Sequence, residues 1–361
     1  MLKPGRAVIS LLALVLAGCA SGPPRKIVRV PDWEREDLAA AAAMAPPPVA
    51  APAPAPVPTP TPSPNNEGHE TWVPLYRWCK SNGLPLPTRV TTSSSPAFAL
   101  NAANGALLLH TASQTAYWDG IDLRLGYAPL LIDDQPFVHT LDLKKTIQPL
   151  LKGSPLCLTR TNRVIVIDPG HGGENAGTRS VLANGYEKDF TLDWARRLSD
   201  LLVTNGWQVF LTRNNDTDLA LSNRVACADV HKADLFLSLH FNSAAPDRSQ
   251  AGLETYCLTP AGMPSTLTRG LSDDLALVFP NNSYDVQNLQ LALRIHRALL
   301  GVNGNHDRGI RRARFLGVLR GQQRPAILIE GGYLSNPHEA RLIAEPAYRQ
   351  SLAGAVARAL E

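Results

Sequence analysis

The second half of the chain alternates between two hydrophobic patterns. Short continuous apolar runs, rich in Val, Ile and Leu, are typical of strands that are buried on both faces. Longer stretches with apolar residues at every third or fourth position are typical of helices that pack on such a sheet. Because the two patterns follow one another from residue 162 to residue 361, the sequence predicts an α/β domain with a mixed, mostly parallel sheet flanked by helices.

The limits of these elements follow from where each pattern starts and stops. The expected strands are Val164–Ile167, Trp207–Thr212, Asp234–His240, Gly252–Leu258, Phe315–Leu319 and Pro325–Glu330. The expected helices are Glu187–Thr204, a helix capped by Ser222, Val286–Leu300 and Pro337–Leu360.

Residues 70–161 show a different pattern, in which short apolar runs are separated by turn residues. Gly120–Gly126 alternates like a half-buried strand, and Ala97–Leu100 is expected to be another strand. With helices at Val73–Gly83 and Leu141–Leu151, this region is predicted to be a small accessory α+β domain. The pattern resembles the copper amine oxidase N-terminal-like domain of bacterial cell-envelope proteins. The resemblance implies no copper, and it leaves open a binding, positioning or spacer role.

The start of the chain is expected to be an export signal. Lys3 and Arg6 give a basic beginning, and the apolar run Ala7–Leu16 is too short to span a bilayer. The following Leu-Ala-Gly-Cys19 resembles the signal of bacterial lipoproteins, in which the cysteine is lipidated and becomes the new N-terminus. Because Ala20 is not aspartate, the resemblance implies a periplasmic protein anchored to the outer membrane through Cys19. A plain signal peptide or a weak anchor helix is the alternative.

Residues 1–19 are therefore interpreted as the signal and the lipidated cysteine, and residues 20–69 as a disordered linker. Residues 39–64 are nearly all Ala and Pro, a composition that cannot form a core and favours an extended polyproline conformation. At about 3.1 Å per residue, about 25 such residues would reach roughly 75 Å. The linker is expected to act as a semi-stiff spacer.

Charge and cysteine content constrain the function only weakly. A net charge of +4 indicates no particular partner, and we expect no nucleic-acid binding. In an oxidising compartment Cys79 with Cys157 and Cys227 with Cys257 would be the pairs within the two domains, and four buried thiols are the alternative. No Cys-x-x-Cys spacing indicates a metal site.

Four polar residues stand at matching positions of the predicted sheet. His171 follows the first strand, and Glu187 opens the next helix. His240 and Glu330 each close a later strand. Taken singly, a histidine in a glycine turn or a glutamate at a helix start is typical of a structural residue. The carboxyl ends of parallel strands meet at one edge of a sheet, so the four side chains are expected to converge.

Two histidines and one glutamate with an open fourth position form a catalytic zinc site. We therefore expect His171, Glu187 and His240 to bind Zn²⁺. Glu330 is expected to be the catalytic acid–base group, because amide hydrolysis needs a carboxylate that takes a proton from water and passes it to the leaving nitrogen.

Short motifs lie at the ends of these elements. They are Asp168–Gly173, Tyr186–Asp189, Thr212–Arg213, Ser222–Arg224, Ser238–Asn242, Gly252–Tyr256, Asp307–Ile310 and Ile329–Asn336. In this order they resemble the zinc-dependent N-acetylmuramoyl-L-alanine amidases, a family of cell-wall hydrolases. The family's zinc ligands and catalytic glutamate fall on the four residues named above. The resemblance implies that peptidoglycan is cut between N-acetylmuramic acid and L-alanine, during wall remodelling or daughter-cell separation.

The segment from Pro260 to Asp285 interrupts the domain after a strand. Some members of the family carry a helix here that covers the zinc until an activator protein removes it. Because the segment contains Leu267, Leu271 and Leu275, partial occlusion of the site and an activator partner are expected. An ordinary loop and helix is the alternative.

Two other functions remain open. A non-catalytic peptidoglycan-binding lipoprotein would be expected to lack a ligand or the glutamate, and all four residues are present. A zinc peptidase acting within the stem peptide would use the same chemistry in a different pocket. The secondary expectations are turn stabilisation by Asp168 and Asn242, pairing of Arg213 and Arg224 with acidic residues, and surface or packing positions for His231, His296 and His306.

Overall fold

The computed structural model describes residues 71–91, 95–153, 163–183, 185–302 and 304–361. The predicted signal with Cys19, the linker 20–69 and Cys157 lie outside these ranges. Within these ranges, no helix combines the length and the hydropathy that are needed to cross a bilayer.

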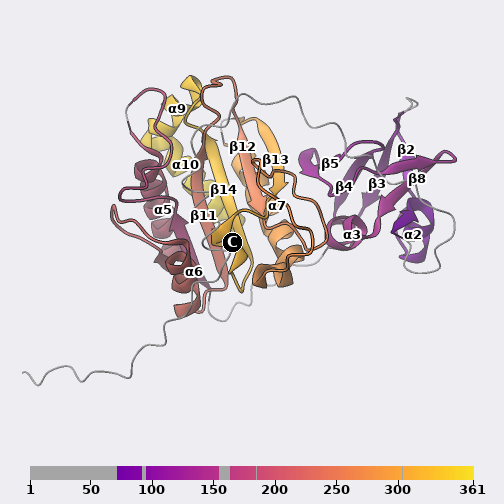
Figure 1. Ribbon diagram of the computed structural model, residues 1–361, viewed down its shortest axis with the longest axis horizontal. Coiled ribbons are helices and arrows are strands. Elements are labelled where there is room, and N and C mark those ends of the chain that lie inside the picture. Colours follow the sequence, from indigo (N-terminus) through magenta and orange to yellow (C-terminus); the bar gives the residue numbers. More distant parts are fainter. Residues whose placement is uncertain (1–70, 92–94, 154–162, 184, 303) are drawn as a thin grey trace, which may run out of the picture.

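One sheet of eleven strands runs through the molecule (Figure 1). In pairing order its strands are β10 (Gln208–Leu211), β9 (Val164–Pro169), β11 (Leu235–Asn242), β14 (Ala326–Tyr333), β12 (Leu253–Cys257), β13 (Asp307–Arg312), β6 (Ile121–Arg124), β5 (Thr115–Trp118), β4 (Gly105–His110), β3 (Ala97–Ala102) and β2 (Thr88–Arg89). From β10 to β6 all neighbours are parallel except β14 and β12. The predicted mixed, mostly parallel sheet is therefore confirmed.

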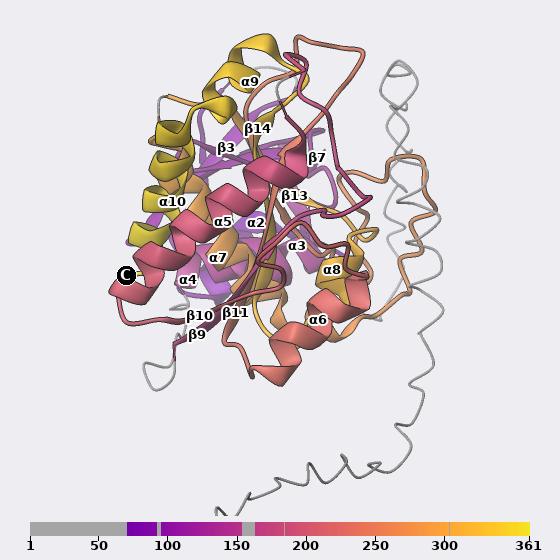
Figure 2. The ribbon, with the colours of Figure 1, turned by 90° about the vertical axis from the view of Figure 1, so that its left-hand side faces the viewer.

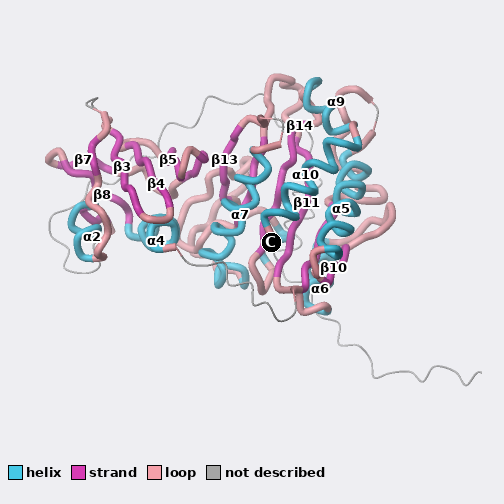
Figure 3. The backbone as a smooth tube through the Cα atoms, turned by 180° about the vertical axis from the view of Figure 1, so that it is seen from behind, coloured by secondary structure: helices cyan, strands magenta, loops and turns pink. Residues whose placement is uncertain are grey.

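Helices cover both faces of the central strands. As Figure 3 shows, α5 (Glu187–Thr204), α7 (Asp285–Leu300) and α10 (Pro346–Ala359) lie on one face. The helices α6 (Leu221–Val230) and α8 (Gly317–Arg320) pack on the other face, and Figure 2 shows them beside each other. The chain also forms the 3₁₀ turn η2 (Pro280–Tyr284) and the helix α9 (Pro337–Ala344).

The alternation of side chains along β9 divides the core into two layers. Ile165 and Ile167 belong to the cluster under α5 and α10, whereas Val166 belongs to the cluster under α6 and α8. Phe236 of β11, which is in register with Val166, and Leu328 of β14 face α6 and α8 as well. Polar residues at the carboxyl ends of these strands continue along the same face.

The first unit, residues 71–153, combines helices with antiparallel strands. Its separate small sheet has the order β1 (Trp72–Pro74), β8 (Gln135–His139) and β7 (Leu130–Ile132). Its helices are α2 (Leu75–Ser81) and a continuous run of α3 (Thr140–Asp142), the π-helical turn η1 (Leu143–Ile147) and α4 (Gln148–Lys152). The strands from β6 to β2 form an antiparallel meander that joins the large sheet where β6 pairs with β13. The boundary near residues 161 and 162 lies outside the described ranges, so the domain division stays a prediction.

Buried polar contacts tie the two units together at β13. One carboxylate oxygen of Asp307 accepts a hydrogen bond from the backbone N–H of Asp122 at 2.9 Å. The other oxygen lies 2.9 Å from Nε2 of His296, a side chain that is fully buried. Arg312, at the end of the strand, donates to Oγ1 of Thr146 at 2.9 Å. The charged residues of β13 therefore serve as the junction between the units.

Replacing Asp307 with alanine is expected to destabilise the protein. The N–H of Asp122 and the ring of His296 would lose their partner, and a buried polar group without one costs about 1–3 kcal/mol. The free energy of unfolding should therefore fall by about 2–4 kcal/mol, as measured by urea denaturation. The matched control is Asp134→Ala, which removes an exposed carboxylate paired with Arg89 and should leave the urea midpoint unchanged. Equal midpoints for the two variants would contradict the proposed junction.

Several predicted boundaries need correction. Phe315–Leu319 is not a strand, because α8 occupies its second half and the strand lies earlier, at β13. Ser222 is not the cap of α6: it lies inside the helix, and Ala220 is the N-cap residue. The last helix is broken at Glu345, because Pro346 has no N–H to continue a helix and instead occupies the first turn of α10.

The suggested disulfide between Cys227 and Cys257 is wrong, because both residues are free thiols. Cys227, on α6, packs against the cluster on one face of the sheet, whereas Cys257, on β12, is buried in the cluster on the other face. The sheet itself separates them. Cys79 is also a free, buried thiol, and its suggested partner Cys157 lies outside the described residues.

Candidate metal centre

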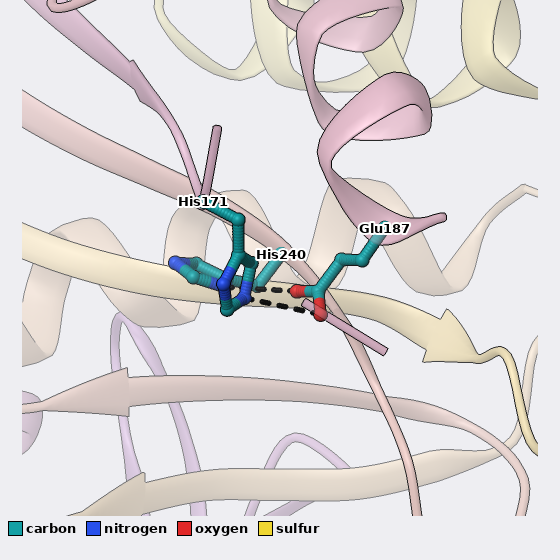
Figure 4. A group of neighbouring side chains, drawn as sticks. All are labelled: His171, Glu187 and His240. Atoms are coloured by element: carbon teal, nitrogen blue, oxygen red, sulfur yellow. Dashed lines mark hydrogen bonds and ion pairs between the residues drawn. The ribbon is translucent and has the colours of Figure 1, made fainter. Parts of the chain in front are cut away.

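Three of the residues chosen from the sequence lie together at the edge of the sheet. His171 lies two residues after the end of β9, Glu187 is the first residue of α5, and His240 lies on β11. Nε2 of His171 is 3.1 Å from Oε2 of Glu187, and Nδ1 of His240 is 2.9 Å from Oε1 of the same carboxylate (Figure 4). One nitrogen or oxygen atom from each residue lies within 4.8 Å of the other two.

The turn after β9 creates the space in which these side chains meet. His171 has a φ of +62°, in the left-handed region that residues with a side chain seldom adopt. A Cβ atom at Gly170 would lie 2.3 Å from the ring of His240. A Cβ atom at Gly177 would lie 2.6 Å from Oε2 of Glu187. Glycine is therefore required at both positions.

Arg224 and Asp168 hold this turn in place. Arg224 donates one hydrogen bond to Oδ1 of Asp168 at 2.7 Å and another to the backbone carbonyl of His171 at 2.8 Å. Burial acts to raise the pKa of Asp168, but the Arg224 guanidinium together with hydrogen bonds from Thr212 and Ser238 holds that pKa below its usual value. Arg224 thus pairs with an acid as expected, whereas Arg213 donates to the backbone carbonyls of Pro169 and Gly170.

Asn175 orients His171 and was not identified from the sequence. Its Oδ1 lies 2.8 Å from Nδ1 of His171, which turns Nε2 of the ring toward Glu187. Hydrogen bonds of this kind fix the orientation and the tautomer of metal-binding imidazoles. The signal in the sequence was an amide side chain four residues after the histidine, inside the same glycine-rich turn.

The three side chains set one another's charge. Burial acts to raise the pKa of Glu187, but the two histidines, His171 above all, hold it well below its usual value. Burial acts to lower the pKa of His171, but Glu187 outweighs it and raises that pKa. For His240 burial prevails, and its pKa is lowered. The centre therefore contains an ionised carboxylate and at least one imidazole that readily gives up its proton.

This donor set fits a zinc ion. Zinc binds imidazole nitrogen and carboxylate oxygen at about 2.0–2.2 Å, and tetrahedral bonds of that length place the donor atoms about 3.3 Å apart. Each imidazole lies close to this distance from one oxygen of the Glu187 carboxylate, His171 at 3.1 Å from Oε2 and His240 at 2.9 Å from Oε1. Three protein donors leave one tetrahedral position for water or substrate, as in catalytic rather than structural zinc sites.

Glu330 lies on the strand next to His240. The two residues are in register across β11 and β14, so their side chains project from the same face of the sheet. Oε2 of Glu330 is buried and has no hydrogen-bond partner among the described residues. Burial and the nearby charge of Glu187 raise the pKa of Glu330 well above its usual value. A carboxyl group that holds a proton this firmly has the property that an acid–base catalyst needs.

A second glutamate lies beside Glu330, and no role was predicted for it. Glu254 of β12 is in register with Glu330 of β14. Its carboxylate accepts hydrogen bonds from the amide of Asn242 at 2.9 Å, the hydroxyl of Tyr256 at 2.7 Å and Nε of Arg308 at 2.9 Å. Asn242 therefore braces this carboxylate as well as its own turn, where its Oδ1 accepts from the next backbone N–H. The network fixes one wall of the site.

Two of the remaining histidines have packing roles, as expected. The ring of His231 stacks on Phe210 with centroids 3.5 Å apart. His296 is fully buried between Thr255 and Asp307. His306 contributes its backbone carbonyl to the N–H of Leu253.

Comparison with known proteins places this centre in a family. The family model described as N-acetylmuramoyl-L-alanine amidase matches residues 165–361. The amidase AmiA of Escherichia coli K12 is 32% identical over 217 residues, which cover 54% of this chain and 74% of AmiA. The amidase AmiC of E. coli O6:H1 is 32% identical over 238 residues, but the chain spans only 56% of its length.

Solved structures of amidases also match part of the chain. The catalytic domain of the amidase CwlV from Bacillus (Paenibacillus) polymyxa var. colistinus is 30% identical, with a TM-score of 0.45 over 55% of this chain and 96% of that domain. An N-acetylmuramoyl-L-alanine amidase from Clostridium difficile 630 is also 30% identical, with a TM-score of 0.46 over 55% of this chain and 95% of its own.

The family model and the match to AmiA establish the relationship. The model covers more than half of the chain, and the matched part of AmiA is most of that protein. The matched residues include the three members of the metal centre and Glu330. The chain therefore belongs to the N-acetylmuramoyl-L-alanine amidase family.

Proposed function

We propose that this protein is a zinc-dependent amidase that hydrolyses peptidoglycan between N-acetylmuramic acid and the L-alanine of the stem peptide. The observation that carries the proposal is the meeting of His171, Glu187 and His240 beside Glu330 in a chain of this family. Cleavage at this bond removes stem peptides from the glycan, which suits wall remodelling or daughter-cell separation.

The side chains divide the chemistry between them. His171, Glu187 and His240 would hold the zinc ion. When bound, zinc polarises a carbonyl and lowers the pKa of water to about 7. Glu330 takes a proton from the attacking water, and its raised pKa allows it to keep this proton until the amine of L-alanine leaves and accepts it. Asn175 and Arg224 hold His171 in position throughout.

We further propose that the protein acts in the periplasm, held at the outer membrane through lipidated Cys19. The lipoprotein-like signal supports this location, and the Ala/Pro-rich linker would carry the enzyme from the membrane toward the wall. The requirement for an activator protein as a partner remains a prediction. Cys19 and the linker lie outside the described residues.

Digestion of purified sacculi tests the proposal. With zinc present, the protein should release stem peptides that begin with L-alanine, and mass spectrometry of the soluble products identifies these ends. Cuts inside the peptide would instead identify a zinc peptidase. Binding to sacculi without any new ends would identify a non-catalytic wall-binding protein.

A further inference from the structure

The segment between β12 and η2 forms an ordered loop and contains no helix. Its two arms are joined where the N–H of Gly262 donates to the carbonyl of Leu275 at 2.8 Å. Asp273 accepts from the N–H of Ser265 at 2.7 Å and forms an ion pair with Arg314, which follows β13. These contacts fasten the loop to the body of the protein, so its tip is presented in a fixed place.

The loop lies over the face of the sheet that carries Glu330. Leu267 packs against the apolar cluster on this face, which includes Tyr256 and Leu328. Side chains two residues apart on a strand share a face, so Leu328 and Glu330 project from β14 in the same direction. The loop therefore lies on the same face of the sheet as the proposed catalytic site and not on the opposite one.

Arg269 stands at the tip of this loop, where the chain turns sharply. Its φ is +50°, and that of the next residue, Gly270, is +78°. The guanidinium carbon lies 5.3 Å from the centre of the Phe315 ring, and Phe315 packs against the same apolar cluster. Arg269 is near enough for its positive charge to act on the side chains of Glu330 and Tyr256.

Among the described residues Arg269 forms no ion pair, whereas two other arginines around the site do. Arg224 is paired with Asp168, and Arg308 is paired with Glu254. Arg269 is exposed and makes its contact with an aromatic ring, which leaves its N–H groups available. An exposed guanidinium that is held in a fixed place suits the binding of a carboxylate from outside.

We propose that Arg269 binds a free carboxylate of the stem peptide and makes the enzyme prefer substrates in which this group is not amidated. The inference rests on the proposed amidase function. The second residue of a stem peptide is a glutamate joined through its γ-carboxyl group, so its α-carboxylate is either free or amidated. This group lies one residue beyond the bond that is cut, and Arg269 would bind it as the peptide enters.

Kinetics on two soluble muramoyl peptides that differ only in this group test the proposal. For Arg269→Gln, kcat/KM on the free-carboxylate substrate should fall about 10-fold to 100-fold, the range for a lost charge-assisted hydrogen bond, mainly through KM. On the amidated substrate kcat/KM should change by less than about 3-fold, because no such bond exists there to be lost. Arg269→Lys, which keeps the charge but not the forked geometry, should fall in between.

The matched control is Arg294→Gln, which removes an exposed arginine from α7, on the opposite face of the sheet. This variant should leave kcat/KM unchanged on both substrates. An equal loss on both substrates in Arg269→Gln, with an unchanged melting temperature, would overturn the proposal, and so would a wild-type enzyme without preference. If the wild-type protein cleaves neither substrate, the amidase function itself is wrong and this inference fails with it.

Discussion

Replacing Glu330 with glutamine is expected to abolish hydrolysis while zinc still binds. Glutamine has nearly the same shape but cannot take a proton from water. Loss of a general base typically costs about 10²–10⁴-fold, and the same group also serves as the acid here, so kcat should fall by about 10³-fold or more. The rate of stem-peptide release from sacculi measures kcat, and metal analysis of the purified variant should show one zinc per chain.

The same substitution should leave the fold as stable as before or more stable. Oε2 of Glu330 is buried without a partner among the described residues, and burial penalises the charged form of this carboxyl group. A neutral amide removes that penalty, so the melting temperature should stay equal or rise. Glu345→Gln, which changes an exposed glutamate between α9 and α10, is the control and should alter neither property. More than about a tenth of the wild-type rate in Glu330→Gln would exclude Glu330 as the acid–base group.

Replacing Glu187 with glutamine is expected to remove zinc and, with it, activity. The carboxylate of Glu187 contacts both imidazoles, and its pKa lies well below the usual value, so it offers a full negative charge to a cation. Loss of a residue that only supports a ligand already costs about 10–100-fold in metal affinity, so loss of this ligand charge should cost at least about 100-fold. Competition with a chromogenic chelator measures the affinity.

Removal of zinc with a chelator, followed by addition of zinc, tests the same prediction through enzyme activity. A strong chelator should abolish wild-type activity, and added zinc should restore it, whereas the variant should recover only with a large excess of zinc. Glu174→Gln changes an exposed carboxylate in the loop between β9 and α5, and its zinc affinity should equal that of the wild type. Unchanged affinity in Glu187→Gln would mean that the metal binds elsewhere.

The centre of the fold could be predicted from the sequence because β9, β11 and β14 are almost entirely buried, which makes their apolar runs continuous. β13 was missed because it is mostly charged. Its Asp307 and Arg308 bond to the N–H of Asp122 and to Glu254, and the first of these partners lies 185 residues away in the chain. No local pattern reveals such partners.

The site was predictable to the extent that it depends on parallel strands. His171, His240 and Glu330 each stand at or near the carboxyl end of a parallel strand, and these ends share one edge. Glu254 was missed because β12 runs antiparallel to β14, which brings the first residues of this strand, and not its last, to the same edge. The direction of a strand depends on the topology of the whole sheet and cannot be read from its own residues.

Arg269 was missed because its position depends on the contacts that hold the loop between β12 and η2 against the rest of the protein.

The pairing of β13 with β6 has a consequence for handling this enzyme in pieces. An uncovered strand edge exposes a row of N–H and C=O groups on which other chains can assemble. In the intact molecule this end of the sheet finishes at β2, which is two residues long, exposed and carries an arginine, all of which discourage further pairing. Truncation to residues 165–361, the part that the family model matches, would uncover β13 and create a template for aggregation. The first unit thus protects the edge of β13 from pairing with other chains.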